Sequence, residues 1–160
     1  MFDNSNQVFC FDMDGTIADF YSVPNWLPML RAYDPTPYRL AKPMQNFSAL
    51  ARQLNAAQRK GAKLVIISWS SKESTPEFDA LVEAAKREWL AKHLPSVEWD
   101  AICVVPYGTN KAEVCGAHGY SYTLFDDDER NHKDWREKGA MPFMPDAITN
   151  VLKTFNRDWA

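Results

Sequence analysis

The sequence predicts an α/β fold in which helices cover both faces of a central parallel sheet. Four short apolar runs, at residues 8–11, 63–68, 101–105 and 120–125, are separated by longer segments whose apolar residues recur at helical spacing. Strands that alternate with helices in this way are typical of a parallel sheet, because each parallel connection has to cross back over one face of the sheet. No internal repeat or low-complexity tract interrupts the pattern.

The first strand is predicted at Val8-Phe9-Cys10-Phe11. An unbroken apolar run of this length indicates a strand that is buried on both faces. After the turn that follows it, residues 20–43 are rich in aromatic residues and prolines and fit neither the strand period nor the helix period. We therefore expect this segment to form an insert after the first strand.

The first long helix is predicted at residues 46–60, where Leu50, Leu54 and Ala57 recur at spacings of four and three. Gly61 follows directly and is a natural stop for the helix. The apolar run at 63–68 then indicates the second strand.

The second helix is predicted at residues 75–93, because Thr75-Pro76 suits a helix start and Pro95 lies just beyond the end. The third strand, 101–105, is followed by a shorter helix at 110–117, which His118-Gly119 should close. After the strand at 120–125, the last helix is predicted at 145–155, preceded by Pro142 and Pro145.

Length and composition indicate a single domain that spans residues 1–160. A chain of 160 residues with 46% hydrophobic and 24% charged residues is ordinary for a globular protein with one core. Residues 1–6 show no basic region ahead of an apolar stretch, and the longest aliphatic run, 64–67, is too short to span a bilayer. We therefore expect a cytoplasmic protein without a membrane partner.

The three cysteines, Cys10, Cys103 and Cys115, fall inside predicted strands or helices, and none belongs to a Cys-x-x-Cys pair. This favours packed thiols in a reducing compartment over a zinc or redox site. The net charge of -3 gives no global basic surface for nucleic acid, although it leaves a local basic patch open. The sequence does not determine the oligomeric state.

The most informative stretch is Phe11-Asp12-Met13-Asp14-Gly15-Thr16, which directly follows the first strand. In an extended segment, Asp12 and Asp14 would point the same way, and Gly15 would let the chain turn sharply beyond them. Two carboxylates in this place suit phosphoryl chemistry, in which one attacks while its neighbour manages the proton. On these six residues alone, a solvated turn and a calcium-type loop remain as alternatives.

This hexapeptide resembles the first motif of the haloacid dehalogenase (HAD) superfamily. There, Asp-x-Asp-Gly-Thr supplies the nucleophile, the general acid and base, and part of a magnesium site. The resemblance implies Asp12 as the nucleophile, Asp14 as the general acid and base, and Thr16 among the substrate-binding residues. It also implies a HAD-like Rossmannoid fold, a three-layer sandwich around a parallel sheet, with the insert at about 20–43 as a minimal cap or flap.

The run Leu64-Val65-Ile66-Ile67-Ser68 resembles the second motif, an apolar strand that ends in a hydroxyl group that holds a phosphate oxygen. Ser68 is the candidate, with Ser70 and Ser71 as alternatives. Trp69, beside Ser68, would add an aromatic face at the substrate. Read alone, a serine in this place is typical of a turn.

The third motif, a lysine at the start of the helix after the third strand, is matched by Gly108-Thr109-Asn110-Lys111. Lys111 would neutralise charge on the nucleophile and on the phosphoryl group. The helix macrodipole disfavours a cation at this end, which indicates that Lys111 serves something other than helix stability. A solvated surface lysine is the alternative without the flanking motifs.

The fourth motif, a strand that runs into paired acids, is matched by residues 122–128, which end in Asp126, Asp127 and Asp128. The resemblance implies Asp127 as a direct magnesium ligand, with Asp126 supporting it or orienting Lys111. Mg²⁺ takes oxygen ligands, often one or two carboxylates with water and phosphate. Read alone, such an acidic run is more typical of a solvated loop; His132 is placed in the loop that follows.

Together the motifs imply a magnesium-dependent phosphatase. Asp12 would form an aspartyl-phosphate, and Asp14 would protonate the leaving oxygen and then deprotonate the attacking water. The metal, held by Asp12, the backbone carbonyl of Asp14, and Asp127, would screen the anionic nucleophile from the anionic substrate. The presence of Asp14 disfavours a dehalogenase, and the short chain disfavours a transport ATPase.

The insert is the expected source of substrate selectivity. It carries Tyr21, Trp26 and Tyr38 together with Arg31 and Arg39, and aromatic faces with arginines suit a base or a phosphate. Packing of these rings onto the domain is an equal alternative. Residues 12–20 also resemble the opening of the pyrimidine 5'(3')-deoxyribonucleotidases, and the whole chain is similar to small HAD proteins of bacteriophages and bacteria.

Three functions therefore remain open. A phosphatase of small molecules, most plausibly of nucleoside monophosphates, leads. A polynucleotide end-processing phosphatase would need a basic groove, which Arg31, Arg39 and Lys42 could begin, but the overall acidity counts against it. A non-catalytic binding module on the same fold is the third.

Overall fold

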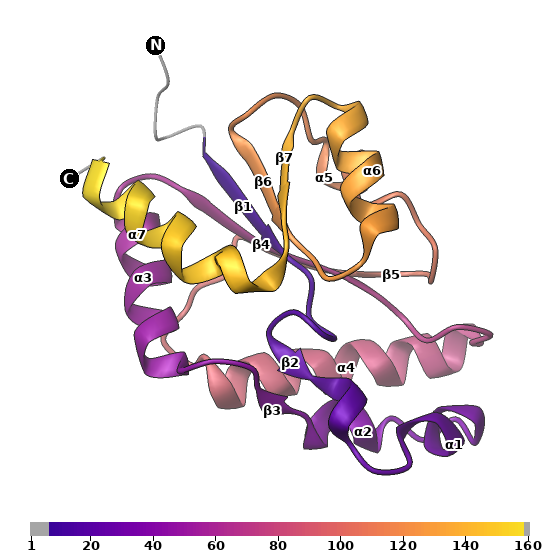
Figure 1. The fold of residues 1–160 in the computed structure, drawn as a ribbon. Coiled ribbons are helices and arrows are strands. Elements are labelled where there is room, and N and C mark those ends of the chain that lie inside the picture. The colour runs from indigo at the N-terminus through magenta and orange to yellow at the C-terminus, as the bar shows by residue number, and fades with distance from the viewer. Residues whose placement is uncertain (1–6, 159–160) are drawn as a thin grey trace.

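A five-stranded parallel sheet forms the centre of the computed structural model, which describes residues 7–158 (Figure 1). The order of the strands is β5-β4-β1-β6-β7, and every neighbouring pair is parallel. The strands are β1 (Val8–Phe11), β4 (Lys63–Trp69), β5 (Ala101–Val105), β6 (Tyr122–Phe125) and β7 (Met141–Phe143).

The register of the central strands brings their carboxyl ends together. Phe11, the last residue of β1, lies opposite Ile66 of β4 and Phe125 of β6. The residues that follow β1 and β6 therefore leave the sheet side by side, with the end of β4 next to them. In open α/β sheets this edge is where ligands bind.

Helices cover both faces of the sheet, as the sequence predicts. On one face, α3 (Phe47–Arg59), α4 (Pro76–His93) and α7 (Ile148–Asp158) pack against Phe9 and Phe11. On the other face, α5 (Lys111–Cys115) and α6 (Glu129–Glu137) pack against Cys10 and Leu124. This arrangement confirms the predicted α/β sandwich with a central parallel sheet.

Three helix starts are fixed by side-chain caps. Asn46 accepts a hydrogen bond from the Ala49 amide at the start of α3, and Thr75 accepts one from the Phe78 amide at the start of α4. Asn110 caps α5 in the same way. Such caps satisfy amide groups that have no partner inside the helix. The sequence prediction counted each capping residue as the first residue of its helix, whereas the helix begins one residue later.

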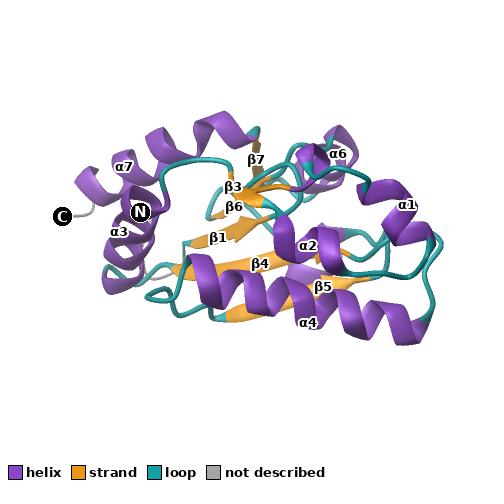
Figure 2. Cartoon of the chain, turned by 90° about the horizontal axis from the view of Figure 1, so that it is seen from below, coloured by secondary structure: helices purple, strands orange, loops and turns teal. Residues whose placement is uncertain are grey.

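The insert is folded and begins and ends in a two-stranded antiparallel sheet. Its strands β2 (Ala18–Asp19) and β3 (Lys42–Pro43) pair with each other. Between them lie the short 3-10 helix η2 (Phe20–Ser22), α1 (Trp26–Arg31) and α2 (Thr36–Leu40). Figure 2 shows α2 resting against α4. The absence of a clear sequence period in this segment reflects elements of only two to six residues.

Several predicted boundaries in the last third of the chain are wrong. The helix predicted at 110–117 ends at Cys115, because Gly116 takes the left-handed conformation that closes helices. The strand predicted from residue 120 begins at Tyr122. Residues 145–147, predicted as the start of the last helix, form a separate 3-10 turn, η3 (Pro145–Ala147), and α7 continues to Asp158.

Outside the insert, α6 (Glu129–Glu137) and β7 (Met141–Phe143) were not predicted. Helix α6 is almost entirely polar, and Trp135 is its one large apolar side chain in the core, so it has no apolar stripe to reveal it. Strand β7 has three residues and contains Pro142, but it lies at the edge of the sheet, where a proline is tolerated. Within residues 7–158, no helix is both long enough and apolar enough to cross a bilayer.

Candidate active site

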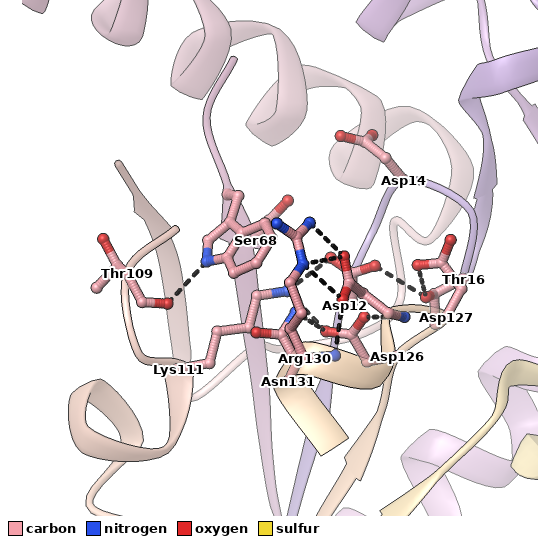
Figure 3. A network of polar contacts seen from close by, with 12 residues as sticks. Asp12, Asp14, Thr16, Ser68, Thr109, Lys111, Asp126, Asp127, Arg130 and Asn131 are labelled. Carbon is pink, nitrogen blue, oxygen red and sulfur yellow. Dashed lines mark hydrogen bonds and ion pairs between the residues drawn. The ribbon is translucent and has the colours of Figure 1, made fainter. Parts of the chain in front are cut away.

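A cluster of three carboxylates lies at the carboxyl edge of the sheet (Figure 3). Asp12 follows β1, and Asp126 and Asp127 follow β6. One side-chain oxygen of each lies within 4.8 Å of the others. Two hydrogen bonds fix the backbone here, from the Asp12 amide to the Phe125 carbonyl (2.9 Å) and from the Asp126 amide to the Phe143 carbonyl (3.1 Å).

Lys111, the first residue of α5, is buried against this cluster. Its Nζ donates to Asp12 Oδ1 at 2.9 Å and to Asp126 Oδ2 at 2.8 Å. Burial alone would lower the pKa of Lys111, but the two carboxylates outweigh it and raise the pKa. Lys111 therefore stays charged and balances part of the negative charge beside Asp12.

Asp126 and Asp127 differ in what their oxygens contact. Asp126 is fully buried, and its Oδ2 also accepts from Asn131 Nδ2 (2.9 Å) while its Oδ1 accepts from the Asp128 amide (2.9 Å). Asp127 is partly exposed, and its Oδ1 lies 3.4 Å from the hydroxyl oxygen of Thr16, whose shorter hydrogen bond goes to Asp12. The oxygens of Asp126 are therefore engaged by protein donors, whereas those of Asp127 are accessible.

Burial, together with the negative charge of the cluster, raises the pKa of two of its members. Burial and then the Asp12 charge raise the pKa of Asp126 to about 7. The same two causes raise the pKa of Asp127 to about 8. Even with the positive charge of Lys111 nearby, it costs free energy to ionise all three carboxylates. A bound metal cation would lower this cost, because it adds positive charge beside them.

Asp14 lies apart from the cluster and points toward α4 (Figure 3). Its Oδ2 accepts from Nζ of Lys86, a buried residue of α4, at 2.9 Å. Burial raises the pKa of Asp14 above its ordinary value, although the charge of Lys86 acts in the opposite direction. A carboxyl group with a raised pKa suits general acid chemistry near neutral pH.

The four predicted substrate-binding residues take different places. Trp69 and Ser70 line the cavity above Asp12. Ser68 is fully buried behind it, and its hydroxyl accepts from Lys86 at 2.5 Å. Thr16 is buried and donates to Asp12 Oδ2 at 2.9 Å, so it holds the predicted nucleophile. Ser71, an alternative to Ser68, also lines the cavity.

The cavity itself holds about 450 Å³ and has an aromatic wall on each side. On the side of the sheet, Trp69 and Tyr107 lie with ring centroids 4.9 Å apart. On the side of the insert, Tyr21 and Trp26 meet at 5.3 Å. The indole of Trp69 is fixed by a hydrogen bond from Nε1 to the Thr109 carbonyl (2.8 Å). The volume is that of a small-ligand site.

Sequence reasoning missed several residues near the cavity. Arg130 places its guanidinium 5.0 Å from the Trp69 ring centre and pairs with Asp128. Asn131 lines the cavity and has a buried Oδ1 with no partner among the described residues. Both lie on the unpredicted α6. His132, placed in a loop by the sequence, is on that helix and hydrogen-bonds the Asp126 carbonyl (2.7 Å).

Lys86 was missed although the sequence carries a signal for it. Phe78, Val82, Ala85 and Trp89 form the buried face of α4, and Lys86 belongs to that face. A lysine within an apolar helical stripe is rare unless it is paired. Such a lysine is therefore a candidate for a buried ion pair, even before its partner is known.

Gly15 brings the first turn close to Asp127. It has φ +79°, and a Cβ at this position would lie 2.8 Å from Asp127 Cγ.

We predict that Gly15→Ala displaces Asp127 and lowers stability by about 1–2 kcal/mol through backbone strain. The measurements are urea unfolding and magnesium titration. Gly119→Ala is the control, since its φ is +71° but nothing lies near its Cβ; it should lose stability but keep its metal affinity. Equal metal affinity in the two variants would contradict this role of Gly15.

Comparison with solved structures places the chain among known folds. The D,D-heptose 1,7-bisphosphate phosphatase from Burkholderia thailandensis is similar, with a TM-score of 0.58 and 14% sequence identity over 96% of this chain and 97% of that one. The two chains share one fold. An uncharacterized protein from Corynebacterium glutamicum is also similar, with a TM-score of 0.50 and 15% identity over 93% and 94% of the two chains.

This likeness concerns the fold, and it agrees with the α/β fold that the sequence predicts. In sequence, no family model matches the chain, and no curated protein matches it. The shared fold is thus evident from the structure, and the residues of the four motifs lie at the ends of its strands or at the start of a helix.

Proposed function

We propose that the protein is a magnesium-dependent phosphomonoester hydrolase that acts through an aspartyl-phosphate on Asp12. One observation carries the proposal: Asp12 lies at the floor of the cavity, between the cation Lys111 and the accessible carboxylate of Asp127. A nucleophile, a charge-balancing lysine and a metal-binding acid are thereby assembled from three separate segments. The HAD-like fold supports the same reaction class.

Magnesium fits the residues at this place. The cluster offers only carboxylate oxygens, which are the ligands that Mg²⁺ prefers. Asp12 and Asp127 would hold the ion directly, with the backbone carbonyl of Asp14, while Asp126 orients Lys111 and Asn131. Asn131 Oδ1, which has no partner among the described residues, would be free to accept from a water that such an ion carries. When bound, the ion supplies positive charge that lets an anionic phosphate approach an anionic nucleophile.

The protein residues would carry out the reaction in two steps. A carboxylate oxygen of Asp12 attacks phosphorus, a new O–P bond forms, and the bond from phosphorus to the leaving oxygen breaks. Asp14 gives its proton to that leaving oxygen. In the second step, ionised Asp14 takes a proton from water, the water oxygen bonds to phosphorus, and the bond to Asp12 breaks to release inorganic phosphate. Lys111 balances the charge throughout.

The cavity supports a nucleotide or another small phosphorylated metabolite as substrate. Its two aromatic walls suit a planar or ring-shaped group, and its volume suits a molecule of that size. The insert supplies one wall, through Tyr21, Trp26 and Tyr38, and would thus act as a small cap. The similar solved structure is named for a phosphorylated sugar, so both compound classes belong in the test.

A polynucleotide substrate finds less support. Of the three basic residues that could begin a groove for it, Arg31 lines the cavity, while Arg39 pairs with Glu88 at 2.6 Å and Lys42 lies on β3, outside the cavity lining. Among residues 7–158, six acidic and three basic side chains line the cavity. A purely binding role would not require Lys111 to be buried and paired with Asp12, or Asp14 to be paired with the buried Lys86.

The test is phosphate release from nucleotides, sugar phosphates and oligonucleotides with 3'- or 5'-phosphates, with and without magnesium. Asp12→Asn serves as the blank. Magnesium-dependent release from a small-molecule class supports the proposal and fixes the substrate family. Release confined to oligonucleotides would move the function to end processing, and a well-folded, silent protein would indicate a binding module.

Magnesium should stabilise the protein more at about pH 8.5 than at about pH 6. The raised pKa values of Asp126 and Asp127 mean that their contribution to stability is full below the ordinary aspartate pKa of about 4. It is lost as the pH rises through about 7 and 8. Metal binds the ionised carboxylates and offsets this loss.

Thermal unfolding with and without magnesium at the two pH values measures this effect. Asp127→Asn should weaken magnesium binding by at least about 10-fold. Asp128→Asn is the matched control, because the charge of Asp128 is already balanced by Arg130 and asparagine also caps a helix. A magnesium shift that is independent of pH, or equal losses in both variants, would count against Asp127 as a ligand.

A further inference from the structure

We infer that Lys86 is a positioning residue that holds Asp14 in place for catalysis, while it also binds the buried Ser68. The inference rests on the proposed function, since it assigns Asp14 the proton transfer. Lys86 lies in the middle of α4, far in sequence from both partners, and belongs to none of the four motifs. Its role is to act through Asp14 without touching the substrate, since Lys86 is not among the residues that line the cavity.

The ammonium group of Lys86 is fully satisfied. Its side chain is 1% exposed. Nζ donates to Asp14 Oδ2 (2.9 Å), to Ser68 Oγ (2.5 Å) and to the Trp69 carbonyl (2.9 Å). An ammonium group has three donors and no acceptor, so these three bonds use all of them. Lys86 thus links the turn after β1 to the end of β4.

Packing alone does not explain a lysine at this position. The other buried residues of α4 are apolar, and a methionine would fill a similar volume without the cost of burying a charge. Replacing buried ion pairs by apolar side chains is often neutral or stabilising. The charge is therefore better explained by what it holds than by what it adds to stability.

The contacts of Lys86 determine how both partners are presented. One oxygen of Asp14 is held by Lys86, so the carboxyl group is fixed beside the cavity and away from the metal-binding cluster (Figure 3). Because Lys86 can only donate, Ser68 must accept, and its hydroxyl hydrogen is left to donate to another acceptor. The bond to the Trp69 carbonyl holds the backbone of a residue that lines the cavity.

Lys86 also contacts the insert. Its Nζ lies 4.9 Å from the ring centre of Tyr38 on α2, a cation–π distance. Tyr38 is buried, stacks on Phe20 at 4.6 Å and lines the cavity. Lys86 therefore connects the insert, Asp14 and the end of β4 through one buried charge.

The test compares Lys86→Met with Lys92→Met, an exposed lysine on the same helix. For substrates with a poor leaving group, such as alkyl phosphates, we expect Lys86→Met to lower kcat/KM by about 10²-fold, because Asp14 no longer delivers its proton from a fixed position. For p-nitrophenyl phosphate, whose leaving group needs no proton, the loss should be much smaller. Lys86→Arg should restore part of the activity, and Lys92→Met should match the wild type.

A double variant separates positioning from a structural role. Removing both charges in Asp14→Asn with Lys86→Met leaves no unpaired buried ion, so the protein should stay folded. If Lys86 acts through Asp14, adding Lys86→Met to Asp14→Asn lowers kcat/KM no further. Multiplicative losses, or equal losses for good and poor leaving groups, would overturn the inference.

Crystal structures give a readout that does not depend on turnover. In Lys86→Met the Asp14 carboxylate should leave its position beside α4, whereas in Lys92→Met it should stay. An unmoved Asp14 would overturn the inference even if no substrate were found. Wild-type protein that releases no phosphate would instead contradict the proposed function, so the two failures are distinct.

Discussion

Asp12→Asn is expected to abolish magnesium-dependent phosphate release, with a loss of about 10⁴-fold or more in kcat, because an amide cannot form the aspartyl-phosphate. The fold should survive. Asparagine has the same shape, and its amide oxygen can accept from Lys111 or Thr16, which now contact Asp12. Removing one of three clustered carboxylates also relieves repulsion with Asp126 and Asp127.

Phosphate release on the best substrate of the panel, together with thermal unfolding, measures both parts of this prediction. Asp19→Asn is a suitable control, since Asp19 lies on β2 and is not among the residues that line the cavity. Asp12→Asn protein that unfolds like the wild type but has no turnover fits the account. Retained turnover would show that another residue is the nucleophile.

Lys111→Met is expected to reduce both turnover and stability. Lys111 is buried and bonds Asp12 and Asp126 at once, so its loss leaves two carboxylates without their cation. Removing one partner of a buried ion pair costs about 3–5 kcal/mol. Turnover should fall by about 10²–10³-fold, because the positive charge beside the phosphoryl group is lost.

Urea unfolding and phosphate release test this prediction. Magnesium should recover more stability in Lys111→Met than it adds to the wild type, since the ion replaces part of the missing charge. Lys133→Met, an exposed lysine on α6, is the control and should behave like the wild type. A change in stability below about 1 kcal/mol would mean that Lys111 is not the main balance for the cluster.

The sequence predicts the central fold well because its signals there are local. Strands β1 and β5 match their predicted bounds, since each is a continuous apolar run. The observed starts of α3 and α4 each lie one residue after the predicted start, because Asn46 and Thr75 are caps that precede the helices. By contrast, α6 is held by the packing of Trp135 in the core and by hydrogen bonds from Asn131 and His132 to Asp126. These are tertiary contacts, and the helix has no apolar periodicity in the sequence that would indicate them.

In the site, too, the residues with a local sequence signal were predicted, and the tertiary contacts were not. Asp12, Lys111, Asp126 and Asp127 were predicted by motifs at strand or helix ends, and the structure brings them together. The motifs did not show that Ser68 and Asp14 share the buried cation Lys86. That partnership joins residues 18 and 72 positions from Lys86, and only the packing of α4 across the sheet creates it.

The most direct test of the central claim is the binding of beryllium trifluoride, a mimic of the phosphoryl group that bonds to a carboxylate nucleophile. We would measure it by ¹⁹F NMR, which needs no knowledge of the substrate. The account predicts bound fluoride resonances in the wild type with magnesium, none without magnesium, and none in Asp12→Asn. Bound resonances that persist in Asp12→Asn, or their absence from folded wild-type protein with magnesium, would contradict a phosphoryl-accepting Asp12.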